Sequence, residues 1–173
     1  MTKISDFELR ERLSQVRLLS LDVDGVLTDG GVYYTDSGEE FKKFNVKDGQ
    51  GLKLLMQAGI EVAILTASSS TSTWHRANKL GISNVFIAVE DKLSVLKDLC
   101  KKLEINLSQV AHVGDDINDL PILELVGCPI ATVDAMPETQ SSAIYTTKQA
   151  GGKGAVREVC NLLLKYHNAD IKD

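Results

Sequence analysis

Residues 18–24, Leu18-Leu19-Ser20-Leu21-Asp22-Val23-Asp24, decide the fold of this 173-residue chain. The stretch is apolar up to residue 21 and then changes abruptly to carboxylates, which predicts a buried strand that ends at a polar site. Four further short apolar runs follow it, at residues 60–65, 85–89, 110–113 and 129–133. Strands that are apolar throughout, and not only at every second residue, belong to a parallel sheet covered on both faces.

Helix-length stretches separate these apolar runs. They lie at residues 51–58, 70–80, 91–103 and 120–126, and three of them end at a glycine, while another helix is expected over residues 155–166. A short helix is also expected ahead of Leu18. The alternation of strands and helices predicts an α/β fold, a doubly wound, Rossmann-like parallel sheet.

One segment interrupts this alternation. Val32 to Thr35 is β-branched and aromatic, Asp36-Ser37-Gly38 has turn chemistry, and a polar stretch leads on to Asn45. These features predict a β-hairpin, at about residues 30–45, inserted after the first strand. Without repeats, low-complexity tracts or proline-rich linkers, residues 1–173 are expected to form a single domain with a flexible tail at about 165–173.

The composition excludes several classes of protein. The chain is 43% hydrophobic and 25% charged with a net charge of −5, as expected for a globular domain, and the acidic balance argues against a nucleic-acid partner. No run reaches the roughly 18 apolar residues of a membrane span, and the charged start does not resemble a signal peptide, so we expect a cytoplasmic protein. The three cysteines are widely spaced and are expected to be buried thiols.

Polar side chains follow the first four of the five predicted strands. Asp22 and Asp24 follow the first, Thr66 the second, Lys92 the third and Asp115 the fourth. Ligands of open α/β sheets bind beyond the carboxyl ends of the strands, so we expect these groups to converge on one crevice. Each motif alone has a simpler reading, a turn or helix cap for the aspartates and Thr66 and a solvated helix residue for Lys92, but the four together favour a site.

The chemistry of that site follows from the residue types. If the strand geometry continued, Asp22 and Asp24 would point to the same side, and Asp115 would add a third carboxylate. Crowded carboxylates repel one another unless a cation lies among them, and an all-oxygen ligand set suits Mg²⁺. Thr66 and Lys92 could then donate to a phosphate, and an aspartate can attack phosphorus to form an aspartyl phosphate.

These residues resemble the motifs of the haloacid dehalogenase-like phosphatases. The motifs are Asp22-Val23-Asp24-Gly25-Val26-Leu27-Thr28, Thr66, Lys92 and Gly114-Asp115-Asp116-Ile117-Asn118-Asp119. More narrowly, residues 27–30, 45–51 and 151–158 are similar to the branch of that family that hydrolyses 3-deoxy-D-manno-octulosonate 8-phosphate (KDO 8-phosphate) in Gram-negative lipopolysaccharide biosynthesis. The likeness runs from about residue 18 to residue 164.

The resemblance implies a role for each residue. Asp22 would be the nucleophile and a Mg²⁺ ligand, Asp24 the acid and base that also gives its backbone carbonyl to the metal, and Asp115 the remaining protein ligand. Thr66 and Lys92 would bind the phosphoryl group, and Asp116 and Asp119 would lie around the direct ligands. The substrate would further contact Asp24, Asn45, Val46, Lys47, Asp48, Gly49, Lys53, Ser68, Arg76 and Lys92.

The chain departs from the family pattern at Ser68. An arginine that meets the substrate is usual there, so Arg76, Lys47 or Lys53 is a candidate for the missing cation. The short gaps between Asp24, Thr66 and Lys92 leave no room for a separate cap domain. In the family a neighbouring subunit covers the site, which implies a homotetramer built through the hairpin.

Alternatives from other classes stay open. A nonulosonate 9-phosphate phosphatase would share the motifs, and a catalytically silent oligomerisation domain would share the fold, although the retained Asp22, Asp24, Lys92 and Asp115 speak against it. A phospho-accepting receiver domain fits poorly, because a hairpin follows Asp24. The cluster Gly151-Gly152-Lys153-Gly154 is interpreted as a flexible entry to the last helix, and His112 as a residue of the core or of a second layer around the site.

Overall fold

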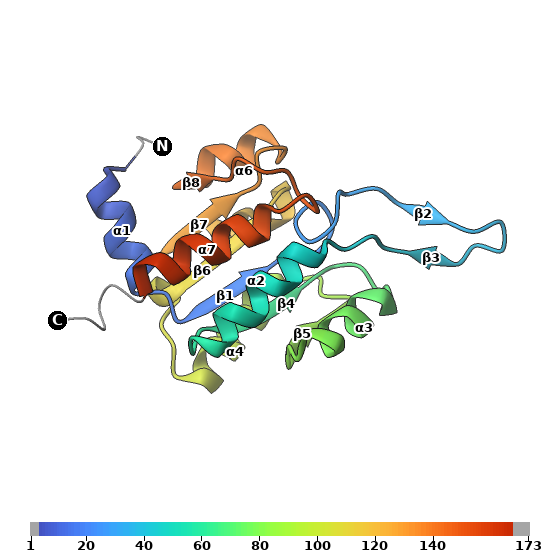
Figure 1. Cartoon of the computed structure of the whole chain (residues 1–173), viewed down its shortest axis with the longest axis horizontal. Helices are drawn as coiled ribbons and strands as arrows, with labels where there is room; N and C mark the ends of the chain where they lie inside the picture. The colour runs from blue at the N-terminus through green and yellow to red at the C-terminus, as the bar shows by residue number, and fades with distance from the viewer. Residues whose placement is uncertain (1–3, 168–173) are drawn as a thin grey trace.

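The computed structural model describes residues 4–167, and its centre is a six-stranded parallel sheet in the order β5-β4-β1-β6-β7-β8 (Figure 1). The strands are β1 (Leu18–Leu21), β4 (Glu61–Leu65), β5 (Asn84–Phe86), β6 (Val110–Gly114), β7 (Cys128–Ala131) and β8 (Tyr145–Thr146). The chain first builds the sheet outward from β1 through β4 to β5, and then returns to the other side of β1 with β6. The order therefore reverses beside β1, where such sheets bind ligands.

Helices cover both faces of the sheet. The α-helices are α1 (Asp6–Ser14), α2 (Val46–Gln57), α3 (Thr71–Leu80), α4 (Lys92–Leu103), α5 (Leu120–Leu123), α6 (Pro137–Ser142) and α7 (Ala155–His167), with 3-10 turns η1 (Leu107–Gln109) and η2 (Ile117–Asp119). Figure 1 shows α2 and α7 side by side on the face nearer the viewer. The predicted doubly wound α/β fold is confirmed.

The central strand β1 shows why its sequence is apolar throughout. Leu19 and Leu21 are buried in the core formed with α2 and α7, whereas Leu18 is buried in the opposite core, formed with α4. Alternate side chains of a strand point to opposite faces, so a strand covered on both sides needs apolar residues at every position. Ser20 is the exception, and it pairs in register with His112 of β6.

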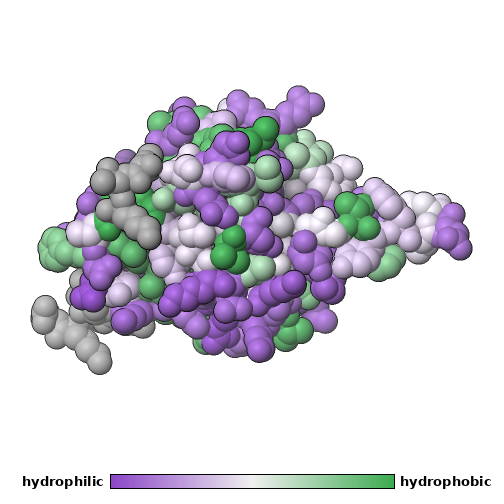
Figure 2. Space-filling model, turned by 90° about the horizontal axis from the view of Figure 1, so that it is seen from above, coloured by the Kyte–Doolittle hydropathy of each residue, from purple (hydrophilic) through white to green (hydrophobic). Residues whose placement is uncertain are grey.

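The predicted hairpin is present and projects from the body of the molecule (Figures 1 and 2). Its strands are β2 (Tyr33–Tyr34) and β3 (Glu40–Phe41), paired antiparallel. The segments between β1 and β4 and between β4 and α4 hold this hairpin, α2, α3 and β5, and among the described residues they hold no cap domain. None of the helices within residues 4–167 combines the length and apolar character that a membrane span requires.

The structure also corrects several expected boundaries. The strand expected over residues 85–89 ends at Phe86, because the backbone turns at Ala88, which has φ 54°. α2 begins five residues earlier than expected, since the Asn45 side chain caps it by accepting a hydrogen bond from the Lys47 N–H at 2.8 Å. The tail expected from residue 165 overlaps the last turn of α7, and its residues 168–173 lie outside the described residues.

The double coverage of β1 makes a prediction about stability. Leu19→Ala should lower the free energy of unfolding by about 2–5 kcal/mol, because it leaves a cavity between the sheet and α7. Leu125→Ala is the matched control, since Leu125 is 49% exposed and should change stability by about 0.5 kcal/mol or less. Urea denaturation followed by circular dichroism measures both, and equal losses would contradict the assigned core.

Candidate active site

Asp22 lies directly after β1, at the centre of the carboxyl edge of the sheet. Its N–H donates to the Val113 carbonyl at 3.1 Å, which extends the pairing with β6 by one residue, and its side chain is buried. The chain then folds into a tight turn, in which the N–H groups of Leu27 and Thr28 donate to the Val23 carbonyl at 2.9 and 3.0 Å. The turn fixes the Asp22 carboxylate on a rigid part of the sheet.

Lys92 joins two of the carboxylates. It is the first residue of α4 and is buried, and its Nζ lies 3.0 Å from Asp22 Oδ1 and 2.7 Å from Asp119 Oδ1. Behind it, the His112 ring has Nε2 3.4 Å from Asp119 Oδ1 and Nδ1 3.1 Å from Ser20 Oγ. The simpler reading of Lys92 as a solvated helix residue is therefore wrong, since burial of a lysine requires partners of this kind.

Asp115, on the loop after β6, adds a third carboxylate. Oxygen atoms of Asp22, Asp115 and Asp119 lie within 4.8 Å of one another, and the Asp115 N–H donates to Asp119 Oδ2 at 3.1 Å. A Cβ at Gly25 would overlap the Asp115 carboxylate, so this close approach needs a glycine there, and the positive φ of 80° favours one too. Three oxygen donors on so small a volume can hold a hard divalent cation.

The pKa values of this cluster reflect its burial. Desolvation raises the pKa of Asp22 to about 6, with a further contribution from the Asp119 charge, even though Lys92 opposes the shift. Desolvation and the nearby carboxylates raise the pKa of Asp115 to about 8. For Asp119, burial acts in the same upward direction, but hydrogen bonding and charge from His112 and Lys92 outweigh it and lower the pKa. Asp22 and Asp115 therefore lack enough neighbouring positive charge to stay ionised at low cost, and a divalent cation would supply it.

Asp24 does not join this cluster through its side chain. β1 ends at Leu21, so the expected alternation of Asp22 and Asp24 along one strand fails, and the Asp24 carboxylate turns toward the hairpin. There Lys42 Nζ lies 2.6 Å from Asp24 Oδ1. Asp116 is exposed, and its carboxylate accepts from the Ile117 N–H at the start of η2 at 2.7 Å.

Thr66 is buried at the carboxyl end of β4, the strand next to β1. Its hydroxyl accepts from the Ser68 N–H at 3.1 Å, and its carbonyl accepts from the Val89 N–H at 3.0 Å. The Ser68 hydroxyl in turn accepts from the Ser70 N–H at 3.2 Å just before α3. Ser68, at the position of the expected arginine, is thus a structural part of this loop.

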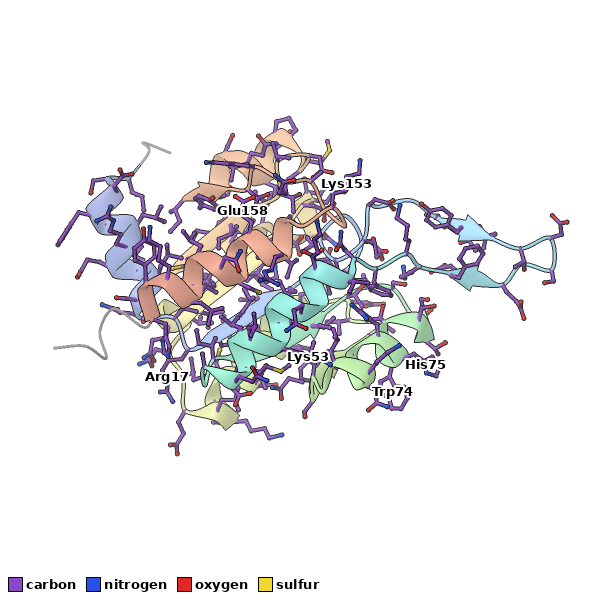
Figure 3. All side chains as sticks on the ribbon, in the orientation of Figure 1. Arg17, Lys53, Trp74, His75, Lys153 and Glu158 are labelled. Carbon is purple, nitrogen blue, oxygen red and sulfur yellow. The ribbon has the colours of Figure 1, made fainter. Side chains whose placement is uncertain are left out.

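The predicted substrate residues are divided between several places. Val46, Gly49, Lys53 and Arg76 line a pocket of about 120 Å³ between α2 and α3, which the acidic cluster does not reach. Lys47 lines a different pocket beside α7, and Asp48 is buried, with Oδ1 accepting from the Arg157 N–H at 2.8 Å. Figure 3 shows Lys53 on the outer side of α2, with Trp74 and His75 projecting from α3.

The glycine cluster before α7 braces the loop that carries Asp24. Gly151 and Gly152 are buried, the Gly152 N–H donates to the Val26 carbonyl at 3.0 Å, and a Cβ at Gly151 would overlap the Gly25 carbonyl. Asn45, at the start of α2, donates from Nδ2 to the Gly152 carbonyl at 3.1 Å. The interpretation of this cluster as a flexible entry is therefore wrong at these two residues.

Sequence reasoning missed one contributor to the site. His112, expected in the core or in a second layer around the site, is buried and contacts Asp119, whereas Lys42 was not singled out at all. The spacing of Glu40 and Lys42, two residues apart at the end of a predicted strand, is a signal that they share one face. Nothing in the sequence indicates that this face meets Asp24.

The raised pKa of Asp115 predicts how the metal-free protein responds to pH. From its ordinary value of 3.8 the pKa rises to about 8 on folding, so between these values the folded state binds more protons and stability falls as pH rises. In chelator, the melting temperature of the wild type should therefore drop from pH 5 to pH 8 relative to Asp115→Asn. Added Mg²⁺ should restore it in the wild type alone, and equal responses of the two proteins in thermal melts would contradict the assignment.

Comparison with known proteins agrees with this geometry. Residues 89–159 match the haloacid dehalogenase-like hydrolase family. The 3-deoxy-D-manno-octulosonate 8-phosphate phosphatase KdsC of Escherichia coli K12 is 46% identical over 153 residues, which cover 88% of this chain and 81% of the relative. The KdsC protein of Yersinia pestis is 44% identical, with 89% and 82% covered.

Solved structures agree as well. The 3-deoxy-D-manno-octulosonate 8-phosphate phosphatase of Moraxella catarrhalis, solved with a magnesium ion, a phosphate ion and a KDO molecule, superposes with a TM-score of 0.92 at 41% identity, covering 96% of this chain and 98% of that one. The cobalt-bound enzyme of Haemophilus influenzae gives a TM-score of 0.87 at 36% identity, with 94% and 95% covered. The chain therefore belongs to the haloacid dehalogenase-like hydrolases, in the family of the 3-deoxy-D-manno-octulosonate 8-phosphate phosphatases.

Proposed function

We propose that this chain is a Mg²⁺-dependent phosphomonoesterase that hydrolyses KDO 8-phosphate to KDO and phosphate. The observation that carries the proposal is the buried cluster of Asp22, Lys92, Asp115 and Asp119 at the switch point of the sheet. Its crowded carboxylates, two of them with raised pKa values, fit a divalent cation. The identity of the substrate is inferred from the relatives named above.

The proposed reaction has two steps. A carboxylate oxygen of Asp22 attacks phosphorus, the bond from phosphorus to the sugar oxygen breaks, and Asp24 gives a proton to the departing alkoxide. Asp24 then takes a proton from water, which attacks the phosphorus of the aspartyl phosphate and releases phosphate and free Asp22. An acid is needed in the first step because a sugar alkoxide is a poor leaving group.

The other residues bind and neutralise. Asp22, Asp115 and the backbone carbonyl of Asp24 would hold Mg²⁺, which when bound neutralises negative charge on the phosphoryl oxygens. Thr66 and Lys92 would bind the phosphoryl group. Burial lowers the pKa of Lys92, but Asp22 and Asp119 outweigh this effect and raise it, so Lys92 can offer a positive charge to the phosphoryl oxygens. Asp116 and Asp119 would lie around the metal ligands, where Asp119 holds Lys92 at 2.7 Å.

A nonulosonate 9-phosphate phosphatase is the second candidate. The observation that keeps it open is Ser68, which stands where the family usually carries an arginine that meets KDO 8-phosphate. Both substrates are phosphorylated acidic sugars, so the chemistry at Asp22 would be the same. A direct comparison of the two esters decides between them.

We also propose that the chain works as a cytoplasmic homotetramer, in which a neighbouring subunit completes each site, within lipopolysaccharide biosynthesis. The hairpin offers exposed apolar side chains, Val32, Tyr34 and Phe41, and Figure 2 views the protrusion on which they lie. Such a group of apolar side chains on a projecting segment suits an interface. Arg76 and Lys53 line a pocket apart from the acidic cluster, which fits contacts that cross between subunits.

The phosphatase proposal predicts a complete dependence on Asp22. The wild type should release phosphate from KDO 8-phosphate with Mg²⁺ and not with chelator, and Asp22→Asn should lower kcat at least about a thousandfold because the nucleophile is lost. Asp98→Asn, on the exposed side of α4, is the matched control and should leave kcat unchanged.

The same assay tests the substrate. KDO 8-phosphate, a nonulosonate 9-phosphate and a neutral hexose phosphate should be compared by kcat/KM, and a preference for the neutral sugar would overturn the assignment to acidic sugars. Persistent activity in Asp22→Asn would overturn the aspartyl-phosphate route. An inactive wild type that still assembles would favour the oligomerisation domain.

The tetramer proposal predicts a change of mass on disruption of the hairpin. Light scattering should give four times the 18.9 kDa of one chain, and Val32→Glu, which buries a charge in the interface, should shift the protein to smaller species. Leu125→Glu places the same charge on another exposed apolar residue and should leave the mass unchanged. A wild type of monomer mass would contradict the shared site.

A further inference from the structure

Lys42 lies at the base of the hairpin and reaches back to the loop of its own subunit. Its Nζ is 2.6 Å from Asp24 Oδ1 and 3.2 Å from Glu40 Oε1. The Lys42 side chain is only 8% exposed, although the Asp24 side chain is 43% exposed. The lysine side chain is thus nearly buried, whereas the carboxylate that it binds is still exposed to solvent.

This pair differs from an ordinary surface ion pair. Exposed pairs contribute little because water screens them and both side chains stay mobile. Here the Lys42 side chain is nearly buried, and its ammonium contacts two carboxylates, those of Asp24 and Glu40, which hold it in one position. Two anchors fix the ammonium, and the ammonium in turn fixes Asp24.

The neighbouring lysine, Lys43, makes a different contact. Lys43 is 61% exposed and pairs at 2.5 Å with Asp29, which lies beyond the turn that carries Asp24. Both lysines carry the same charge on adjacent positions of one segment. Lys42 contacts Asp24, and Lys43 contacts the start of the hairpin.

We propose that Lys42 is a positioning residue that holds the Asp24 carboxyl group in place for proton transfer to the leaving oxygen: its ammonium donates to Oδ1, and the proton that is transferred sits on Oδ2. This inference rests on the phosphatase function proposed above. Proton transfer needs the donor within hydrogen-bond reach of the reacting oxygen, and a carboxylate free to rotate spends little time there. The hairpin base is then part of the catalytic machinery of its own subunit, in addition to any contact with a neighbour.

The leaving group gives a readout that a general loss of structure would not change. A sugar alkoxide needs a proton from Asp24 to depart, whereas p-nitrophenolate departs readily without one. The quantity to measure is kcat/KM, because it covers the steps up to departure of the leaving group and excludes hydrolysis of the phosphoenzyme.

The experiment compares Lys42→Met, Lys42→Arg and Lys43→Met with the wild type on KDO 8-phosphate and p-nitrophenyl phosphate. Lys42→Met should lower kcat/KM for the sugar ester at least about tenfold, which is part of the rate enhancement that a general acid supplies. It should change kcat/KM for the aryl ester less than about threefold. Lys42→Arg should retain most of the wild-type kcat/KM for the sugar ester. Lys43→Met, the matched control, should leave the ratio of the two substrates unchanged.

Two further measurements keep the result decisive. A crystal structure of Lys42→Met should show the Asp24 carboxylate displaced or spread over several rotamers. If Lys42→Met fails to fold, Lys42→Gln, which keeps a hydrogen-bond donor without the charge, is measured in its place and should show a smaller change in the same ratio.

The inference is overturned if both esters lose activity equally in Lys42→Met, if neither does, if Lys43→Met shifts the ratio as strongly, or if Asp24 keeps its position in the variant. A wild type that hydrolyses KDO 8-phosphate with any of these outcomes leaves the phosphatase function standing. A wild type that hydrolyses neither ester overturns the function and the role of Lys42 together.

Discussion

The structure depends on placing three carboxylates where water cannot solvate them fully. Asp22, Asp115 and Asp119 meet at the carboxyl edge of the sheet, and Lys92, inserted between Asp22 and Asp119, is the only lysine or arginine among the described residues that forms an ion pair with them. Removing charges from water is costly, and this cost, together with repulsion between the carboxylates, raises the pKa values of Asp22 and Asp115. Other parts of the fold stabilise this arrangement. β4 and β6 pair with β1 on its two sides and fix the backbone next to Asp22, and the His112 ring contacts the Asp119 carboxylate.

The central strands of the sheet and part of the acidic cluster could be predicted from the sequence. The uniformly apolar stretches at residues 18–21 and 110–113 predicted central strands because both faces of each are covered. The residues just after them then had to meet, since parallel strands end at one edge. Asp22 and Asp115 lie close together for this reason. Two-residue β8 and six-residue α6 were missed, because elements so short carry no periodic signal.

The features of the site that were not predicted depend on contacts between segments far apart in the sequence. The direction of the Asp24 side chain is set by Lys42, 18 residues later, and no local pattern reports it. The burial of Gly151 and Gly152 depends on the loop at Gly25, more than a hundred residues earlier. Val46, Lys53 and Arg76 were predicted from family resemblance alone, and their pocket between α2 and α3 contains no acidic residue that would explain them within one subunit.

The contact of Gly151 and Gly152 with the Asp24 loop has a consequence for biosynthesis. The turn at residues 22–28 emerges from the ribosome early, whereas the glycines that support it, and the Asn45 bond to Gly152 that joins them to α2, are complete only near the end of translation. A nascent chain that stops short of residue 152 can form the central strands but leaves the back of this turn open to solvent. The geometry around Asp24 is therefore among the last features of the chain to form during synthesis, because the segment that supports it is made after every strand of the sheet.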